Sequence, residues 1–253
     1  AGLKADFGSG EWDGGPIGLP YVVVSGSQAR VAVSFDYADE SDPGPYPIPD
    51  DAPIEGGPSA TGDRHVLIVD KDACRLYELY DAHHLADGTW HAGSGATWDL
   101  RSNALRPAGW TSADAAGLPI LPGLVRYDEV AAGSVQHAIR MTIPVSNDSY
   151  LWPARHKAGS TSDVNTPAMG QRFRLKRTVD PATYPASVRP IIKALQTYGA
   201  IVADNGSAWF LSGVPDPRWN NDDLQALRAI KGSDFEAIDS STMSVSPDSG
   251  AAR

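Results

Sequence analysis

The sequence predicts a mainly β protein: an antiparallel β-sandwich or jelly-roll-like domain with two peripheral α-helices. Its composition combines 20 prolines and 25 glycines with 7 tryptophans and 9 tyrosines, which is typical of short strands joined by turns. β-Branched and alternating runs recur along the chain, without the strand and helix alternation of a parallel sheet. Helical patterns occur late and singly, so two antiparallel sheets packed face to face are the expected layers.

Expected strands in the first half of the chain cover residues 21–24, 29–35, 65–69, 74–80 and 90–98. The first two are β-branched runs separated by Ser-Gly-Ser-Gln, which predicts that they pair with each other. Asp-Lys-Asp and Ala-Asp-Gly turn signals separate the last three, which should therefore form a meander. The segment 102–133 lacks alternation and contains four glycines and three prolines, so a long excursion with short helical turns is expected.

The second half of the chain should contain strands at 135–145, 171–179 and 234–239, and helices at 187–199 and 220–233. The first of these helices has a serine cap, an apolar stripe and a closing glycine. Asn205 and Gly206 form the strongest hairpin signal in the chain, so residues 200–213 are expected to fold back as two paired strands. One domain should span residues 1–240, followed by a disordered polar tail at 241–253.

The charge of the chain limits its partners. Asp and Glu number 31 against 21 Lys and Arg, and the formal net charge is −10. This negative field repels phosphate backbones, so nucleic acid is not an expected partner. No apolar run approaches the ~18 residues of a membrane span. The start without methionine fits a processed export product and a trimmed chain equally well. The acidic, Trp-, Gly- and Pro-rich composition favours a secreted protein that works outside the cell.

Three stretches of the sequence carry a family resemblance, at residues 102–133, 198–224 and 232–239. They resemble a family of uncharacterised secreted bacterial proteins, and the resemblance spans residues 16–240. It implies a single exported domain and brings no activity with it. The E-x-D-x-x-E motif of laminarinase-type glycosidases is not supported, because the nearest string, ESDPGP, lacks the last acid.

An acidic stretch at residues 34–53, SFDYADESDPGPYPIPDDAP, contains six carboxylates and five prolines. Its first acids leave an expected strand directly, so a sheet edge could hold them as a site. Glycoside hydrolysis needs one carboxyl with a raised pKa and one ionised partner, about 5–5.5 Å apart for retention or about 6.5–9.5 Å for inversion. The candidate acids are Asp36, Asp39, Glu40, Asp42 and Asp204, with Asp128, Glu129 and Asp234 as further members. Solvated surface acids remain the alternative, since Asp and Glu are normally exposed.

A second group of candidates lies in the long loop 146–170, which shows little periodicity. Loops of this length inside a compact domain are often functional. The loop offers Tyr150 and Trp152 as stacking surfaces for a sugar, Arg155 as an anchor for a carboxylate or hydroxyl, and His156 as a group that titrates near neutral pH. Trp219, in a polar loop, is a second candidate platform. A loop held by ordinary salt bridges remains the alternative.

Two kinds of metal site are also suggested by the sequence. If Asp87 and Gly88 form a two-residue turn, His84 and His91 lie opposite each other and could share a zinc or copper ion. Cross-strand surface histidines are the alternative. The acids at 36–42 supply hard oxygens for a structural calcium ion, although their spacing is not that of an EF-hand. No organic cofactor is expected.

These features predict a secreted, carbohydrate-active protein whose partner is a polysaccharide or oligosaccharide. The leading hypothesis is a glycan-cleaving enzyme of the glycoside hydrolase type, with the acids at 36–42, Asp204 and His156 as catalytic groups. A non-catalytic carbohydrate-binding or cell-surface module is the alternative, and a metal-dependent oxidative enzyme at His84 and His91 is the third. G-x-S-x-G, G-x-G-x-x-G and P-loop strings do not occur, so serine-hydrolase and nucleotide chemistry have no support.

Overall fold

The computed structural model describes residues 2–253, and strands predominate over helices in it, which confirms the mainly β prediction. The strands are β1 (Lys4–Asp6), β2 (Glu11–Trp12), β3 (Gly15–Pro16), β4 (Tyr21–Val24), β5 (Val33–Phe35), β6 (Val66–Asp70), β7 (Arg75–Tyr80), β8 (His83–His84), β9 (Trp90–Ala92), β10 (Ser94–Asp99), β11 (Ile139–Ile143), β12 (Arg172–Leu175), β13 (Ala200–Asn205), β14 (Phe210–Ser212) and β15 (Phe235–Ile238). The α-helices are α1 (Tyr127–Ala131), α2 (Arg189–Thr197) and α3 (Asn221–Gln225).

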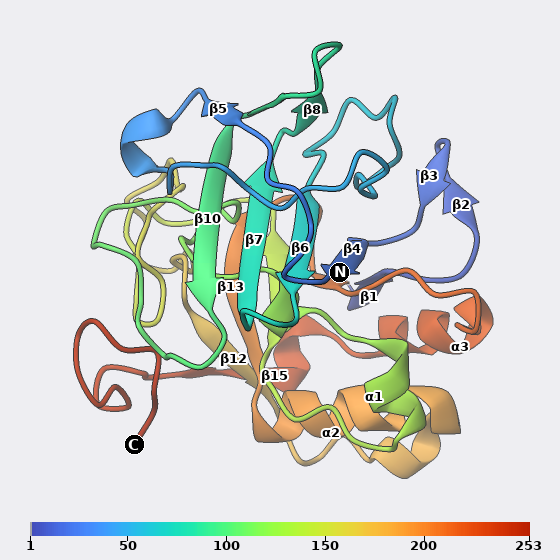
Figure 1. Ribbon diagram of the computed structural model, residues 1–253. Coiled ribbons are helices and arrows are strands. Elements are labelled where there is room, and N and C mark those ends of the chain that lie inside the picture. Colours follow the sequence, from blue (N-terminus) through green and yellow to red (C-terminus); the bar gives the residue numbers. More distant parts are fainter. Residues whose placement is uncertain (1) are drawn as a thin grey trace.

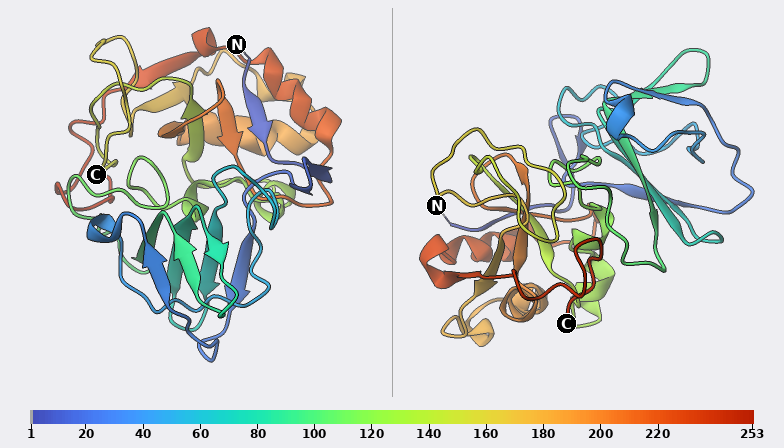
Figure 2. Two further views of the ribbon diagram at one scale, coloured as in Figure 1. Left: turned by 90° about the horizontal axis from the view of Figure 1, so that it is seen from above. Right: turned by 90° about the vertical axis from the view of Figure 1, so that its left-hand side faces the viewer.

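Two larger sheets organise the molecule. One has six strands in the order β1-β14-β11-β13-β12-β15, and the other has four in the order β10-β7-β6-β4. A three-stranded sheet, β5-β9-β8, and the β2–β3 pair complete the pairing. The three-stranded sheet lies at the end of the molecule remote from α1 and α2 (Figure 1), and the left view of Figure 2 separates the two larger sheets into an upper and a lower part.

The six-stranded sheet is mixed, which corrects the expectation of purely antiparallel pairing. β1 runs parallel to β14 and β11 runs parallel to β13, whereas β11 and β14 are antiparallel. The hairpin predicted at Asn205-Gly206 is wrong, because β11 lies between β13 and β14. Four of the five residues of β11 are buried, so this apolar strand is stabilised at the centre of the sheet, and the local turn signal does not decide which strands pair.

The four-stranded sheet contains the predicted meander, since β6, β7 and β10 pair antiparallel in sequence. Two details differ. The expected partners β4 and β5 do not pair: β4 joins β6 and β5 joins β9, both in parallel. The strand expected at 90–98 also divides at Gly93 into β9 and β10, which belong to different sheets. A Cβ at Gly93 would lie 2.7 Å from the Tyr80 ring, so a larger residue would fit there only if the ring shifted.

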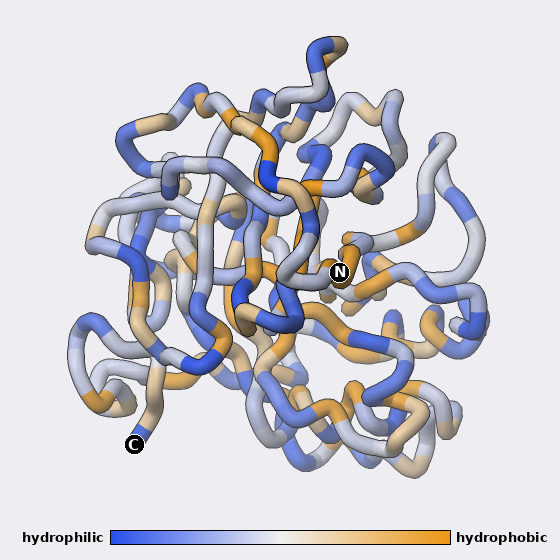
Figure 3. Tube along the Cα trace, viewed as in Figure 1, coloured by the Kyte–Doolittle hydropathy of each residue, from blue (hydrophilic) through white to orange (hydrophobic). Residues whose placement is uncertain are grey.

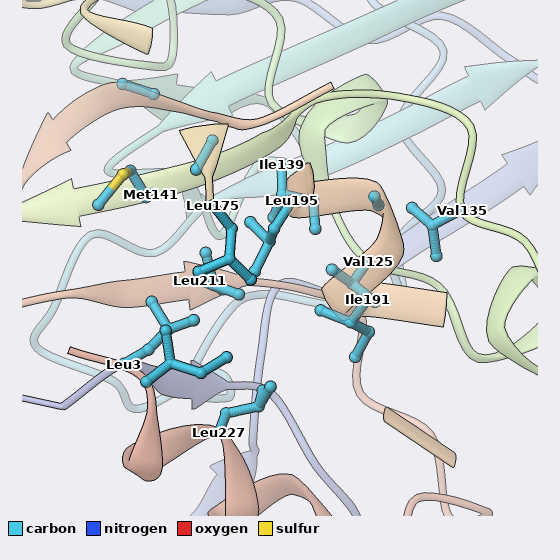
Figure 4. Packing of buried hydrophobic residues seen from close by; sticks show 14 of the residues in the cluster. Leu3, Val125, Val135, Ile139, Met141, Leu175, Ile191, Leu195, Leu211 and Leu227 are labelled. Carbon is cyan, nitrogen blue, oxygen red and sulfur yellow. The ribbon is translucent and has the colours of Figure 1, made fainter. Parts of the chain in front are cut away.

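Three hydrophobic clusters fill the interior. The largest packs the six-stranded sheet against α2 and α3, and Figure 4 shows Met141, Leu175, Leu195 and Leu211 within it. The second and third clusters contain alternate residues of β6 and β7, so both faces of the four-stranded sheet are covered. The hydropathy colouring of Figure 3 places hydrophobic residues along these strands and hydrophilic residues in the outer loops.

Glu78 fixes the long 102–133 excursion against the four-stranded sheet. Its side chain, on β7, is fully buried and accepts hydrogen bonds from the backbone N–H groups of Ile120 and Leu121 and from Trp98 Nε1. Burial raises the pKa of Glu78 to about 7, against the opposing effect of these donors. The carboxyl group therefore anchors the segment that carries Asp114 into the interior.

The C-terminal elements are only partly as predicted. Helix α2 lies within the expected range, and Gly199 beyond its end has a φ of +78°. The last strand, β15, is confirmed. Residues 241–253, expected to be a disordered tail, instead contact two loops: Trp152 Nε1 donates to the Ser249 carbonyl (2.8 Å), and the Gly250 N–H donates to the Asn103 carbonyl (2.7 Å). Within residues 2–253, no helix combines the length and apolarity that crossing a membrane requires.

Candidate functional site

A small acidic cavity of about 140 Å³ lies where the six-stranded sheet meets the segment leading into β6. Its polar lining comes from β1, β11, β13 and the segment 55–65. The charged residues that line it are Asp6, Glu55, Asp63, His65, Arg140 and Asp204. Two strands of this sheet, separated by β14 and β11, carry acids of the cavity: Asp6 ends β1, and Asp204 is the penultimate residue of β13. We call this site the acidic cavity.

Arg140, from the central strand β11, organises the acids around it. Its Nε and Nη2 atoms donate to the two carboxylate oxygens of Asp114 at 3.1 and 3.0 Å, which is a bidentate pair. Nη2 also donates to Asp204 at 3.0 Å, and Nη1 donates to the Ser212 hydroxyl at 2.7 Å. The side chains of Arg140 and Asp114 are 6% and 1% exposed. One buried guanidinium therefore holds two carboxylates in fixed positions.

The acids of this group differ in ionisation. Burial raises the pKa of Asp204 to about 6, although the charge of Arg140 opposes the shift. Burial likewise raises the pKa of Asp114, against the effect of its pair with Arg140. The pKa of Arg140 itself is raised, because the charges of its two carboxylate partners have a larger effect on it than burial, which lowers it. The carboxyl group of Asp204 therefore takes up and releases its proton at mildly acidic pH.

His65 and Glu55 form the opposite wall of the cavity. The His65 ring is 2% exposed, and its two nitrogens face Glu55 Oε2 at 2.6 Å and the Ala113 carbonyl at 3.0 Å. Both partners are acceptors, so both ring nitrogens must donate and the ring is an imidazolium. Burial disfavours the charged ring and by itself would lower the pKa of His65. The charge of Glu55 and its hydrogen bond have the larger combined effect and raise this pKa to about 9. Burial would raise the pKa of Glu55, but the His65 charge lowers it instead.

Asp6 is the third acid of the cavity whose pKa is shifted from its ordinary value. Desolvation of its carboxyl group raises its pKa, and the charge of Glu55 adds to the rise. The residue as a whole is exposed, so the carboxyl group lies at the mouth of the cavity, where a ligand can reach it. The cavity therefore combines one firmly ionised acid, Glu55, with two acids that bind protons more readily, Asp6 and Asp204.

The His65–Glu55 pair predicts a specific dependence of stability on pH. The folded-state pKa of His65, about 9, lies above the unfolded value of about 6.5. Its contribution is therefore complete below pH 6.5 and is lost as pH rises through 9, and it amounts to about 3 kcal/mol. Urea unfolding between pH 6 and 10 measures this loss. His65→Gln should abolish this loss, whereas His83→Gln, at a half-exposed histidine, should keep it. If the stability of His65→Gln falls with pH as steeply as that of the unchanged protein, the assignment is contradicted.

Arg140 also lines a second, larger cavity of about 850 Å³, here called the groove. Its wall is formed by β10, the excursion residues 102–123, and parts of β11, β12 and β13. Asp42 and Asp114 contribute to this wall, each already paired with an arginine. The acidic cavity and the groove therefore share one side chain, Arg140, and differ in character: the first is acid-rich and the second is mostly apolar.

The acids predicted at 36–42 lie apart from the acidic cavity. Asp36 pairs with His91 (3.3 Å) and is largely exposed, as is Asp39. Glu40 accepts the Thr111 N–H at 2.8 Å, and Asp42 pairs with Arg106 and accepts the Thr97 N–H at 2.7 Å. Of the predicted catalytic acids, the structure places Asp204 in the acidic cavity and Asp42 in the wall of the groove.

The predicted aromatic and basic residues mostly hold the structure together. Arg155 is 7% exposed, donates to the Arg106 and Pro247 carbonyls, and pairs with Asp248. His156 Nδ1 lies 2.9 Å from the Ala115 carbonyl. Tyr150 packs against the large core cluster, and Trp152 bonds to the C-terminal segment. Trp219 is 5% exposed and packs against Phe7 and Tyr127, so its indole face is not available to a sugar in this structure.

The predicted histidine pair has a different register. His83, not His84, is opposite His91, and His84 is opposite Trp90. The His84 ring stacks on the Trp90 ring with a centroid separation of 4.9 Å. The turn is longer than two residues, because the Leu85 N–H donates to the Thr89 carbonyl. Across residues 2–253, no group of three or more His, Cys, Asp or Glu side chains is placed to hold a metal ion.

Sequence reasoning did not find Asp6, Glu55, His65, Asp114 and Arg140 as site residues. For Arg140, the sequence does contain a signal that could have identified it. This arginine interrupts the apolar strand IRMTI, and four of the five residues of that strand, Arg140 included, are buried. A charged residue inside a buried strand needs a partner of opposite charge. Comparisons of the chain with protein-family models, with curated proteins and with solved structures found no match.

Proposed function

We propose that the protein is a secreted glycan-cleaving hydrolase of the acid–base type, that the acidic cavity is its active site, and that its two larger sheets form a sandwich-like framework. The observation that carries this proposal is the contrast inside one cavity between Glu55, whose pKa is lowered, and Asp204, whose pKa is raised to about 6. Carboxyl groups whose environments push their pKa values apart are the basis of glycosidase acid and base assignments.

The hydrogen-bonding character of the cavity supports a hydroxyl-rich substrate. Arg140 and His65 supply its cationic donors, and these are already bonded to protein acceptors. The remaining polar lining includes the carboxylates of Asp6, Glu55 and Asp63, which only accept when ionised. A ligand that supplies hydrogen-bond donors therefore suits these carboxylates. Sugar hydroxyl groups are such donors, and an excess of carboxylates disfavours an anionic sugar at this position.

The roles follow from the ionisation of the acids. Asp204, with a pKa near the pH of mildly acidic surroundings, donates a proton to the leaving glycosidic oxygen. Glu55 stays ionised beside the His65 imidazolium and activates water or attacks the sugar carbon. Asp6, at the mouth, binds substrate hydroxyl groups. His65 and Arg140 are positioning residues, because they hold Glu55 and Asp204 and are themselves fixed by buried hydrogen bonds.

A panel of neutral plant, fungal and bacterial glycans tests the proposal. Purified protein at pH 5 is expected to release reducing ends from at least one of them. Release from none, with the protein folded, contradicts the proposed function. Binding of a glycan without release would instead indicate a non-catalytic carbohydrate-binding module. Asp39→Asn supplies the matched control, since Asp39 is exposed and lines neither cavity, and it should keep full activity.

A further inference from the structure

The groove differs from the acidic cavity in size and in lining. Its volume of about 850 Å³ falls within the ~300–1,000 Å³ range of small-molecule sites. Apolar side chains make up much of its wall, including Trp98, Leu100, Leu105, Leu118, Pro119, Pro122 and Ile201. Sites for small organic molecules combine such a lining with a few charged groups that fix orientation.

Two arginines in the groove, Arg75 and Arg172, have no acidic partner among residues 2–253. Both are half-buried. Arg75 lies opposite Asp70 and Asp99 in the sheet, but these acids form ion pairs with Arg30 and Arg101 instead. The other arginines of the groove differ, because Arg106 is paired with Asp42 and Arg140 with two acids.

Arg172 is the more strongly desolvated of the two. Its Nη1 atom donates to the Tyr198 carbonyl at 2.6 Å, and its Nε atom is buried without an acceptor in the described chain. Burial lowers the pKa of Arg172, the reverse of the shift at Arg140. A buried guanidinium N–H without an acceptor is costly. An anionic ligand in the groove would remove that cost.

We infer that the groove binds a small organic anion with an apolar body, whose acidic head group pairs with Arg172. The apolar body contacts the leucine, proline and tryptophan side chains of the wall. A carboxylate, phosphate or sulfonate head accepts charge-assisted hydrogen bonds from guanidinium groups. This inference does not rest on the proposed function, since Arg172 does not line the acidic cavity.

The probe that tests the inference is 8-anilinonaphthalene-1-sulfonate, which joins an apolar ring system to one sulfonate. Its neutral counterpart is N-phenyl-1-naphthylamine. Calorimetry on the native protein is expected to show one sulfonate probe per chain, with weaker binding at higher salt. The sulfonate probe should also raise the thermal unfolding temperature, because it binds the folded state. Absence of binding, or a lowered unfolding temperature, overturns the inference.

Variants locate the site and its charge dependence. Arg172→Gln should weaken the sulfonate probe about tenfold and leave the neutral probe unchanged. Ala104→Trp, at an exposed position in the wall, should weaken both probes by filling the groove. Arg174→Gln is the control on the same strand, since Arg174 is exposed and paired with Glu236. Equal sulfonate affinity in the Arg172 and Arg174 variants contradicts the inference.

Discussion

Asp204→Asn is expected to lower kcat on a cleaved glycan by about 10²- to 10⁴-fold, the usual contribution of a general acid or base. The amide keeps the shape of the carboxyl group but cannot deliver its proton. Arg140 retains its bidentate pair with Asp114 in this variant, so thermal unfolding should change little. Steady-state kinetics on purified protein measures the loss. A kcat within threefold of the unchanged protein would falsify the role of Asp204.

The pH profile gives a second test of the same group. Asp204 must be protonated to act, and its pKa is raised to about 6, so kcat/KM should fall as pH rises through about 6. Glu55 must be ionised, and its pKa is lowered from an ordinary value of 4.5, so activity should persist below pH 4.5 until Glu55 is protonated. Asp39→Asn should give the same profile as the unchanged protein. A rate that keeps rising from pH 6 to pH 8 contradicts the assignment.

Arg140→Met is expected to destabilise the protein by about 3–5 kcal/mol, because removing one partner leaves a buried charge without compensation. The group left behind is Asp114, whose side chain is 1% exposed. Urea unfolding at pH 7 measures the change. The deficit should shrink at lower pH, since protonated Asp114 carries no charge and its burial already favours the protonated form.

Two further variants separate the charge effect from lost packing. Arg140→Met combined with Asp114→Asn should be more stable than Arg140→Met alone, because the uncompensated carboxylate is gone. Arg174→Met provides the control, since its pair with Glu236 is about half exposed and such pairs contribute at most about 1 kcal/mol. Equal losses from Arg140→Met and Arg174→Met contradict the view that Arg140 organises the interior.

Local patterns predicted the elements well and their partners poorly. The meander β6-β7-β10, helix α2 and strand β15 all follow from apolar periodicity, turn residues and closing glycines within short windows of sequence. Asn205-Gly206 is also a genuine local signal, yet β11 enters between the two strands on either side of it. Which strands become neighbours depends on burial of whole apolar strands, and a turn signal carries no information about that.

Short-range sequence patterns were also a poor guide to the residues of the candidate site. Asp204 was a candidate from sequence, but Asp6, Glu55, His65 and Arg140 are separated from it along the chain and meet only in the folded state. The acids at 36–42 were conspicuous because they cluster in sequence. In the structure they are exposed or bonded to the loops beside them. Clustering along the chain therefore was a weaker guide than a charged residue inside an apolar strand.

The sequence by itself determined the mainly β class, the negative net charge and the positions of most strands, because these depend on composition and short-range periodicity. Only the tertiary structure decided the mixed strand order, the acidic cavity around Arg140 and the unpaired arginines of the groove. Ionisation is set by burial and by charges within a few ångströms. Those neighbours come from distant parts of the chain, so Asp204 acquires its raised pKa only when β11 and β13 pair.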